Sequence, residues 1–224
     1  MGGHPAGDVA AAVAVEAIQR FHDEPGTASP GHVGGLRSAP RAVLAAAVKH
    51  ANLSIRERAA REPEKRGMGA AIVAMLATST GFCVAHVGHA RCYRLRDRRL
   101  EKLTEDHTRL NEYVGHGVPI DAALRMPDQA ALSRALGSKE NVDVTVGMDD
   151  ARRGDVVLLC SNGLHGALSD DEIARVLVAQ SDVDETAAAL IGIAGARGAP
   201  DDVTCVVLRW TNEAVARSAE GPQT

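Results

Sequence analysis

Aromatic side chains are scarce in this chain. Phe, Tyr and Trp together make up 2% of its 224 residues, so a core has to be built mainly from Ala, Val, Leu and Ile. This scarcity argues against a stacking surface for single-stranded nucleic acid, which needs several exposed rings. An excess of positive charge is also missing, because the formal net charge is -4 and the pI is about 6.1. Such a chain does not attract a polyanion, so we expect no nucleic-acid partner.

Long apolar runs and paired cysteine motifs are lacking as well. No stretch of about 18 apolar residues occurs, so we expect no membrane span and no membrane partner. The first residues do not show a basic segment followed by an apolar one, and therefore no secretory signal is expected. The four cysteines form no Cys-x-x-Cys motif, which disfavours a zinc site. They lie in apolar contexts typical of small buried thiols, and a reduced cytoplasm fits them best.

The composition that is present indicates an ordinary folded domain. Hydrophobic residues make up 45% of the chain and charged residues 24%, which is enough for a sizeable core and is not typical of disorder. The length suits one domain. We expect that domain over residues 1–210, followed by a polar, disordered tail over residues 211–224.

Hydrophobic periodicity and turn residues divide the chain into helices and strands. Helices are expected over residues 7–23, 41–61, 105–114, 129–136, from 169 onward, and 183–196. Ser169 and Glu172 form a capping-box pattern at the start of the fifth of these. Loops are expected over 24–40, 62–69 and 115–128, and strands over 70–78, 81–87, 90–96, 100–104, 142–146, 155–160 and 203–210. The first four strands are joined by short turns, which predicts an antiparallel meander and an α+β fold.

Three polar turns share one pattern. Each lies at the end of a core strand and carries a short polar side chain, next to a glycine in the first two: Gly88-His89, Asn162-Gly163 and Asp201-Asp202. Strand ends at one edge of a sheet can converge, so these turns are candidates for a common site. On its own, the first turn is better explained as an ordinary hairpin corner.

The chain resembles the PPM-type, metal-dependent protein phosphatases (the protein phosphatase 2C family) in their bacterial form. Ordered segments from residue 1 to about residue 210 look like that family's motifs: Met1-Gly2-Gly3-His4, Gly67-Met68-Gly69-Ala70, His86-Val87-Gly88-His89-Ala90-Arg91, Leu103-Thr104-Glu105-Asp106-His107, Leu132-Ser133-Arg134-Ala135-Leu136-Gly137, Cys160-Ser161-Asn162-Gly163-Leu164 and Asp201-Asp202-Val203-Thr204. The resemblance implies two antiparallel sheets in an α-β-β-α sandwich with helices on the outer faces.

The resemblance also implies a chemistry. Two Mn²⁺ or Mg²⁺ ions held by aspartates activate a water that attacks phosphoserine or phosphothreonine in proteins. Hard divalent ions need anionic oxygen ligands, so the carboxylates decide whether this copy fits. The family's first Asp-Gly pair and its first strands would precede Met1. Either the coding start has been placed at an internal Met, or the chain is an N-terminally truncated copy.

The metal positions inside the chain are substituted. By the resemblance, the family's second aspartate falls on His89 and its third on Asn162, while the last is retained as Asp201. Neighbouring residues that match the family are expected to support the site: Gly2, Gly3, Gly88, Arg91, Ser161, Gly163 and Asp202. His89 favours softer metals than Mg²⁺, and Asn162 offers an oxygen without charge.

Three interpretations follow from these substitutions. The first is a pseudophosphatase that acts in phosphoprotein signalling by binding phosphorylated proteins or a Ser/Thr kinase. The second is a weak phosphatase with an altered metal site, and the third is a fragment that does not fold alone. Asp106 and His107 are expected to hold the loop that follows them by hydrogen bonds rather than to take part in catalysis.

Overall fold

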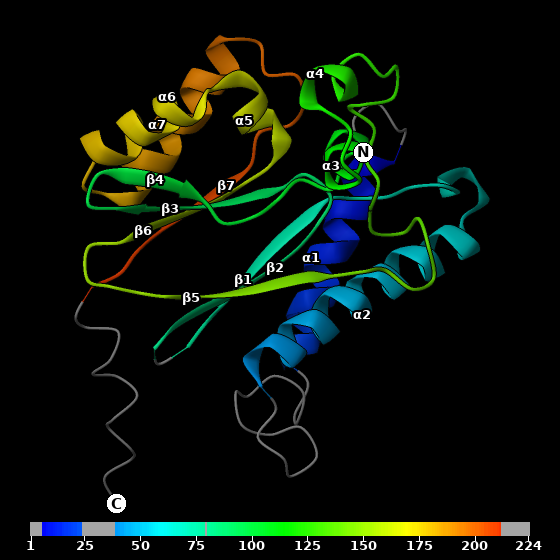
Figure 1. The fold of residues 1–224 in the computed structure, drawn as a ribbon. Helices are drawn as coiled ribbons and strands as arrows, with labels where there is room; N and C mark the ends of the chain where they lie inside the picture. Colours follow the sequence, from blue (N-terminus) through cyan, green and yellow to red (C-terminus); the bar gives the residue numbers. More distant parts are fainter. Residues whose placement is uncertain (1–5, 24–38, 79, 212–224) are drawn as a thin grey trace, which may run out of the picture. The chain divides into compact units, whose positions relative to one another are not determined.

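The computed structural model describes residues 6–23, 39–78 and 80–211, which form two compact units. The first unit comprises Met1–Leu76, Cys83–Ala90 and Thr104–Gly147. The second comprises Ala77–Phe82, Arg91–Leu103 and Met148–Thr224. The chain therefore passes back and forth between the two units (Figure 1).

Two long helices begin the first unit. They are α1 (Gly7–Asp23) and α2 (Pro40–Arg61), which pack against each other. Helix α1 buries Ala10, Ala14 and Ala17, a spacing of three to four residues that places them on one face. Alanine is a strong helix former, and its small side chain lets α1 come close to α2. Both predicted helices are confirmed, with α2 beginning one residue earlier at a proline, as first helical turns allow.

Short elements follow in the first unit. They are the 3₁₀ turn η1 (Pro63–Lys65), α3 (Arg109–Gly115) and α4 (Ile120–Ala123). The predicted helix over 105–114 starts too early, because the Thr108 side chain caps α3 by accepting a hydrogen bond from the Asn111 backbone N–H. The predicted loop over 115–128 is wrong in part, since it contains α4.

The predicted helix over 129–136 is wrong. Its backbone pairs with other segments instead: the Leu136 N–H donates to the Ala70 carbonyl at 2.9 Å, and the Ser133 N–H donates to the His107 carbonyl at 3.0 Å. These bonds replace the bonds that a helix would form within itself. Gly137 then takes a positive φ of 83°, which ends the segment in a turn.

A three-stranded sheet contains β1 (Ile72–Ala77), β2 (Gly81–Val87) and β5 (Thr145–Asp150) in the order β1-β2-β5. The central strand β2 is buried along its whole length, as its apolar sequence predicts. Strand β5 begins later than the predicted strand over 142–146. The core of the first unit is made of the alanines of α1, aliphatic residues of α2 and the inner residues of β2.

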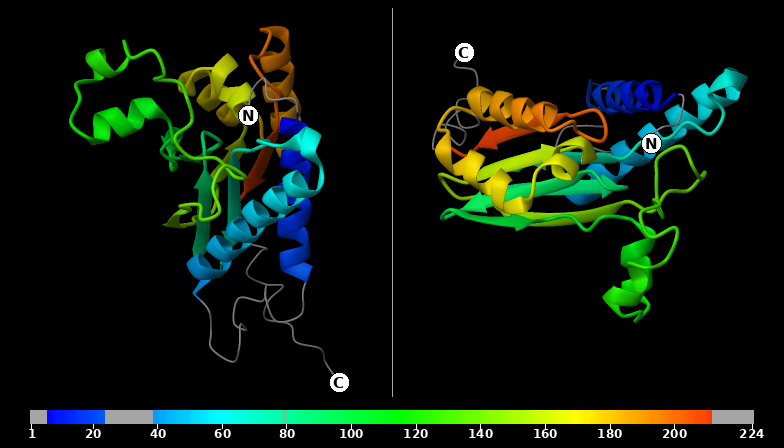
Figure 2. Two further views of the ribbon diagram at one scale, coloured as in Figure 1. Left: turned by 90° about the vertical axis from the view of Figure 1, so that its right-hand side faces the viewer. Right: turned by 90° about the horizontal axis from the view of Figure 1, so that it is seen from above.

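The second unit is built on a four-stranded antiparallel sheet. Its strands are β3 (Arg91–Arg96), β4 (Arg99–Lys102), β6 (Val156–Cys160) and β7 (Cys205–Arg209), in the order β4-β3-β6-β7. Helices α5 (Asn162–Ala167), α6 (Asp170–Ala179) and α7 (Val183–Ala196) lie on one side of this sheet (Figure 2). They cover a core that contains Tyr93, Leu158, Leu164, Ile173 and Leu190.

The predicted meander over residues 70–104 is wrong in part, because β1 neighbours β2 and β3 pairs with β4 as expected, but β2 does not pair with β3. Strand β2 belongs to the three-stranded sheet and β3 to the four-stranded sheet, so the turn at Gly88-His89 carries the chain from one sheet to the other. The length and polarity of a turn do not show whether it joins two paired strands of a hairpin or two strands that belong to different sheets. The α+β class with two antiparallel sheets and several helices is confirmed.

Among the described residues, no helix is long and apolar enough to cross a membrane. The expected tail over 211–224 lies, except for residue 211, outside the described residues, so it stays a prediction.

Candidate functional site

The start of α5 and the turn before β7 come together in the second unit. The Asn162 side-chain amide donates from Nδ2 to Oδ2 of Asp201 at 3.2 Å. The other carboxylate oxygen of Asp201, Oδ1, accepts a hydrogen bond from the Asp202 backbone N–H at 2.9 Å. Both oxygens of this carboxylate therefore have a hydrogen-bond donor from the chain itself.

Ser161 ties the same two segments at the backbone level. Its hydroxyl donates to the Asp202 carbonyl at 2.9 Å and accepts from the Thr204 N–H at 2.9 Å. Its own N–H donates to the Thr204 carbonyl at 2.9 Å. Ser161 thus adds hydrogen bonds between the end of β6 and the residues that precede β7.

Gly163 is required by the closeness of these segments. A Cβ atom at this position would lie 2.4 Å from the Asp202 carbonyl oxygen and 2.5 Å from that of Asp201. Only a residue without a side chain fits such an approach. Five predicted site residues are therefore brought together in the second unit: Ser161, Asn162, Gly163, Asp201 and Asp202.

The turn that contains Gly88 and His89 belongs to the first unit. Gly88 has a φ of 93°, and a Cβ there would lie 2.7 Å from the Cβ of Ala71. Its N–H donates to Nδ1 of His107 at 3.1 Å, and its carbonyl accepts from the His107 N–H at 2.9 Å. His89 follows as a half-buried residue of this tightly held turn.

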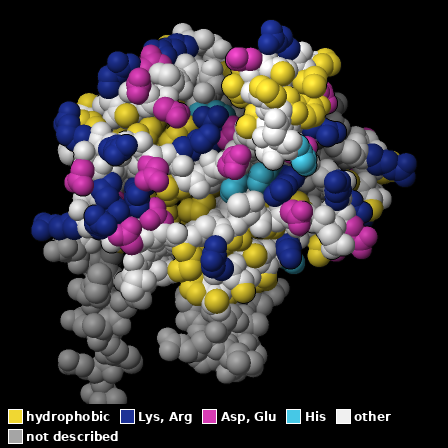
Figure 3. Space-filling model, viewed as in Figure 1, with side chains coloured by type: hydrophobic (Ala, Val, Ile, Leu, Met, Phe, Trp, Pro, Cys, Tyr) yellow, Lys and Arg dark blue, Asp and Glu magenta, His cyan; other side chains and the backbone are white. Residues whose placement is uncertain are grey.

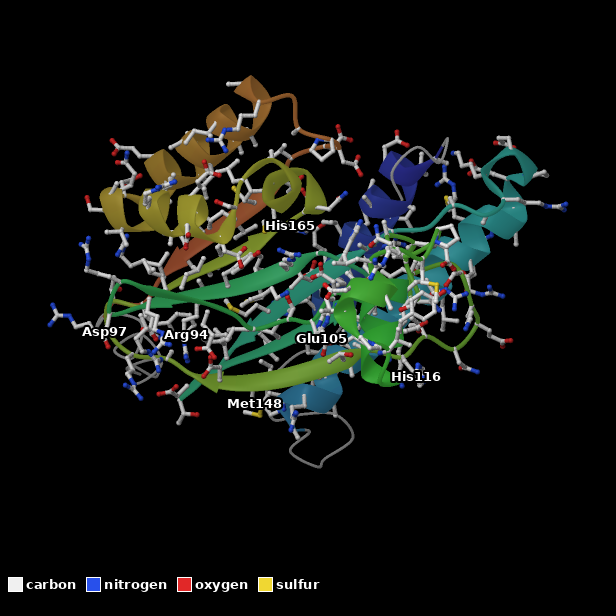
Figure 4. All side chains as sticks on the ribbon, turned by 45° about the horizontal axis from the view of Figure 1, so that its top comes forward. Arg94, Asp97, Glu105, His116, Met148 and His165 are labelled. Atoms are coloured by element: carbon white, nitrogen blue, oxygen red, sulfur yellow. The ribbon has the colours of Figure 1, made fainter. Side chains whose placement is uncertain are left out.

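A pair of stacked imidazoles supports that turn. The rings of His86 and His107 lie 4.5 Å apart between centroids at an interplanar angle of 18°. Nε2 of His86 bonds to the Glu105 carbonyl at 2.9 Å, and Nε2 of His107 bonds to the Thr145 hydroxyl at 3.0 Å. The residue Glu105 is labelled in Figure 4. The ring of His107 therefore holds the Gly88 turn and the start of β5, rather than the loop that follows it as expected.

Burial keeps both imidazoles uncharged at neutral pH. Desolvation lowers the pKa of His107 to about 4, and the neighbouring His86 and Arg134 act in the same direction. Desolvation also lowers the pKa of His86. Because Nδ1 of His107 accepts the Gly88 N–H, this ring carries its proton on Nε2. The stacking could not be predicted from the sequence, since the two histidines are far apart along the chain.

Arg91 belongs to the second unit. Its Nη1 donates to the Tyr93 hydroxyl at 2.8 Å, and that hydroxyl donates to Oδ1 of Asp170 at 2.8 Å. Tyr93 is fully buried, and a buried phenol needs such a partner. No pattern in the sequence indicated Tyr93 or Asp170. Only the general rule about buried tyrosines would have suggested the first.

An open groove of about 810 Å³ lies along the β3–β4 hairpin. Four basic residues line it, and Figure 3 shows Lys and Arg mixed with Asp and Glu in this region. Arg94 pairs with Asp149 at 2.6 Å and with Glu101 at 2.6 Å, while Arg96 pairs with Asp155 at 2.6 Å. Arg94 on β3 and Asp97 at the hairpin turn are labelled in Figure 4. The charges of Arg94 and Arg96 are therefore balanced within the protein.

The remaining predicted residues are Gly2 and Gly3, which lie outside the described residues together with His4. Among the residues that the structure does describe, no group of three or more His, Cys, Asp or Glu side chains is arranged to hold a metal ion.

Comparisons with known proteins agree with this fold. No family model matches the chain. The serine/threonine protein phosphatase PstP of Mycobacterium tuberculosis is 37% identical over 208 residues, which is 92% of this chain. This chain spans 38% of the length of that relative. The serine/threonine phosphatase stp of Listeria monocytogenes is 30% identical over 211 residues, covering 93% of this chain and 81% of the relative.

Solved structures give the same result. The catalytic domain of PstP in complex with two manganese ions matches 92% of this chain and 83% of its own, with a TM-score of 0.74 and 36% identity. The similarity in sequence and in fold extends over nearly the whole chain. The chain belongs to the PPM-type serine/threonine phosphatase family in its bacterial form.

Proposed function

We propose that this chain is a PPM-type phosphatase domain with little or no catalytic activity. The observation that carries the proposal is the hydrogen bond from Asn162 Nδ2 to Asp201 Oδ2 at 3.2 Å. Two carboxylates at such a distance repel each other, and a divalent cation between them relieves the repulsion. An amide beside a carboxylate satisfies it directly, so the pair needs no cation.

The donor chemistry also disfavours a pair of Mn²⁺ or Mg²⁺ ions. The turn supplies one retained family carboxylate, Asp201, whose two oxygens already accept hydrogen bonds. His89, at the other substituted family position, offers a nitrogen ligand that suits zinc, copper or nickel better than Mg²⁺. We therefore propose that binding of Mn²⁺ or Mg²⁺ is weakened or lost. The other named residues, Gly88, Arg91, Ser161, Gly163 and Asp202, act as structural supports, and Gly2 and Gly3 keep the supporting role that the resemblance implies.

A phosphatase fold that has lost its metal ligands can still bind the proteins that the family recognises. We propose that the chain acts in phosphoprotein signalling in the cytoplasm by engaging phosphorylated Ser/Thr proteins or a Ser/Thr kinase. Replacement of Asp201 by Ala is expected to leave binding of a phosphothreonine peptide within about twofold in fluorescence anisotropy. Loss of binding on this replacement contradicts a role that is independent of the metal site.

Enzyme assays test the catalytic part of the proposal. The purified 224-residue chain with Mn²⁺ is expected to hydrolyse p-nitrophenyl phosphate and a phosphothreonine peptide no faster than its Asp201→Ala variant. The PstP catalytic domain, assayed alongside, provides the positive control. Mn²⁺-dependent turnover that the Asp201→Ala change abolishes would establish the second candidate, a weak phosphatase with an altered metal site, which the retained Asp201 favours.

A stability measurement tests the same site without turnover. Asn162→Asp replaces the hydrogen bond by two adjacent carboxylates, so the melting temperature in EDTA is expected to fall by several degrees. Added Mn²⁺ is expected to restore part of that loss in the variant and to leave the original chain unchanged. A clear rise in the melting temperature of the original chain with Mn²⁺ would contradict the proposed loss of metal binding.

A further inference from the structure

Two cysteines face each other across neighbouring strands of the second unit. The β6–β7 register places Cys160 directly opposite Cys205. Side chains of directly opposed residues point to the same face of a sheet. Both residues pack in the core beneath the helices of this unit, which agrees with that placement. Both are thiols in the structure.

The hydrogen bonds at the two ends of the strand pair show what kind of pair this is. The Ser161 N–H donates to the Thr204 carbonyl at 2.9 Å, and the Trp210 N–H donates to the Asp155 carbonyl at 2.9 Å. Hydrogen-bonded and non-hydrogen-bonded pairs alternate along an antiparallel ladder. The pair that adjoins Ser161 and Thr204 is therefore a non-hydrogen-bonded one, and it consists of Cys160 and Cys205.

Non-hydrogen-bonded pairs have the spacing that a disulfide needs. Their Cα atoms are about 4.5 Å apart and their side chains approach closely. A disulfide joins Cα atoms that are about 4.4–6.8 Å apart. The other thiols lack this arrangement, because Cys92 lies opposite Leu159 and Cys83 lies on β2 of the three-stranded sheet.

We propose that Cys160 and Cys205 form a reversible cross-strand disulfide when the protein meets a peroxide oxidant. The Cys205 thiolate attacks one oxygen of hydrogen peroxide, an S–O bond forms and the O–O bond breaks, which gives Cys205 sulfenic acid and hydroxide. The hydroxide takes up the proton that the Cys205 thiol released on ionisation and becomes water. The Cys160 thiol then attacks the oxidised sulfur, the S–O bond breaks, and the S–S bond forms with release of a second water. The two sulfur atoms together lose two electrons, which the peroxide takes up, and a dithiol reductant reverses the change.

Exposure decides which cysteine reacts first. Cys205 is half-buried, whereas Cys160 is 3% exposed. Burial raises the pKa of the Cys205 thiol, so the reactive thiolate is a minor species at neutral pH. The rate of disulfide formation is therefore expected to rise by about tenfold per pH unit between pH 7 and pH 8.

The proposed disulfide lies at the base of the candidate site. Cys160 directly precedes Ser161 and Asn162, and Cys205 follows the turn that carries Asp201 and Asp202. A covalent link here holds the two segments at the distance that the Asn162–Asp201 hydrogen bond requires. The link depends on the strand register alone, and it stands whether or not the site hydrolyses phosphate.

Peptide mapping tests the link directly. The reduced 224-residue chain is treated with hydrogen peroxide, the remaining thiols are alkylated, and trypsin digestion follows without reductant. Cleavage at Arg153, Arg175, Arg197 and Arg209 releases one peptide with Cys160 (residues 154–175) and one with Cys205 (residues 198–209). We expect these two peptides to be joined, the thiol count to fall from four to two, and dithiothreitol to restore both.

Variants identify the partners. Cys160→Ser or Cys205→Ser is expected to remove the linked peptide, while Cys83→Ser, the matched control, retains it. The original chain gives the decisive result even where a serine variant fails to fold. Absence of the 154–175/198–209 link after oxidation, a link through Cys92, or only intermolecular links overturns the proposal.

Discussion

At the scale of single residues, the buried imidazoles make stability depend on pH. The pKa of His107 is lowered from 6.5 to about 4 in the folded chain by burial. A histidine with a lowered pKa stabilises the fold above the pKa of the unfolded state, and this contribution is lost as pH falls below it. The loss between pH 7 and pH 5 is about 2 kcal/mol for His107, and His86 acts in the same direction.

We expect the melting temperature to fall by about 4–8 °C between pH 7 and pH 5 because of this pair. Thermal unfolding followed by circular dichroism at both pH values provides the measurement. His107→Gln, which removes the titration, is the control and is expected to reduce the difference. An equal pH dependence in the variant would show that other groups are responsible.

Gly163 allows a second prediction at the same scale. Gly163→Ala places a Cβ 2.4 Å from the Asp202 carbonyl oxygen and 2.5 Å from the Asp201 carbonyl oxygen. The start of α5 and the 201–202 turn therefore have to separate. The free energy of unfolding is expected to fall by about 1–3 kcal/mol in urea titration. Gly192→Ala is the matched control, because nothing lies within 4 Å of its Cβ position and the helix gains about 0.5–1 kcal/mol. Equal effects of the two changes would contradict the close approach at Gly163.

The resemblance predicts Asn162 and Asp201 as positions of one site. Their side chains are hydrogen-bonded in the structure, and their place in a metal site stays a prediction. Tyr93 and Asp170 were missed because their contact joins residues 77 positions apart along the chain. Such contacts depend on how strands and helices pack, which periodicity does not contain.

At the scale of elements, the start of α6 shows how a local pattern fixes a boundary. The Ser169 hydroxyl accepts from the Glu172 N–H, and the Glu172 carboxylate accepts from the Ser169 N–H at 3.0 Å. The same carboxylate binds Arg197 at 2.6 Å and 2.8 Å, and these bonds hold the pKa of Glu172 at about 2. The capping box was predicted correctly because all its partners lie within four residues.

Ser169→Ala removes one half of this box. The free energy of unfolding is expected to fall by about 1 kcal/mol, since an N–H at the start of α6 loses its acceptor. Ser169→Thr keeps a hydroxyl and is expected to change it by only a few tenths of a kcal/mol. Urea titration of both variants tests the expectation, and a loss in the Thr variant as large as in the Ala variant would contradict it.

Elements whose secondary structure or strand pairing depends on residues far away in the sequence were predicted less well. Residues 129–136 have a helical pattern, but their N–H and carbonyl groups pair with Ala70, His107 and Arg109. Strands β2 and β3 were correctly bounded within one residue, yet they belong to different sheets. Local propensity determines that a segment is extended, and only the remainder of the fold determines which strand it pairs with.

At the scale of the whole molecule, the two units share chain segments. Strand β2 begins with two residues of the second unit and continues with five of the first, since the division falls between Phe82 and Cys83. Unfolding of either unit therefore disrupts a part of β2 and destabilises the part of β2 that belongs to the other unit. We expect one cooperative unfolding transition.

The single tryptophan makes this expectation testable. Trp210 belongs to the second unit, where its ring lies 5.5 Å from that of Phe82, so its fluorescence reports on that unit. Leu44→Ala opens a cavity in the core of the first unit and is expected to lower stability by about 2–5 kcal/mol. The urea midpoint of Trp210 fluorescence is expected to shift as far as the circular dichroism midpoint. A fluorescence midpoint that stays in place would mean that the units unfold independently.

The interleaved path of the chain also limits how the protein can be divided. Each unit is assembled from three separated stretches of sequence, so no single cut in the gene yields a coding segment for one unit alone. A ribosome has to complete residue 147 before the last stretch of the first unit is available, and by then part of the second unit has already been made. Expression of half-length pieces is therefore expected to yield aggregates.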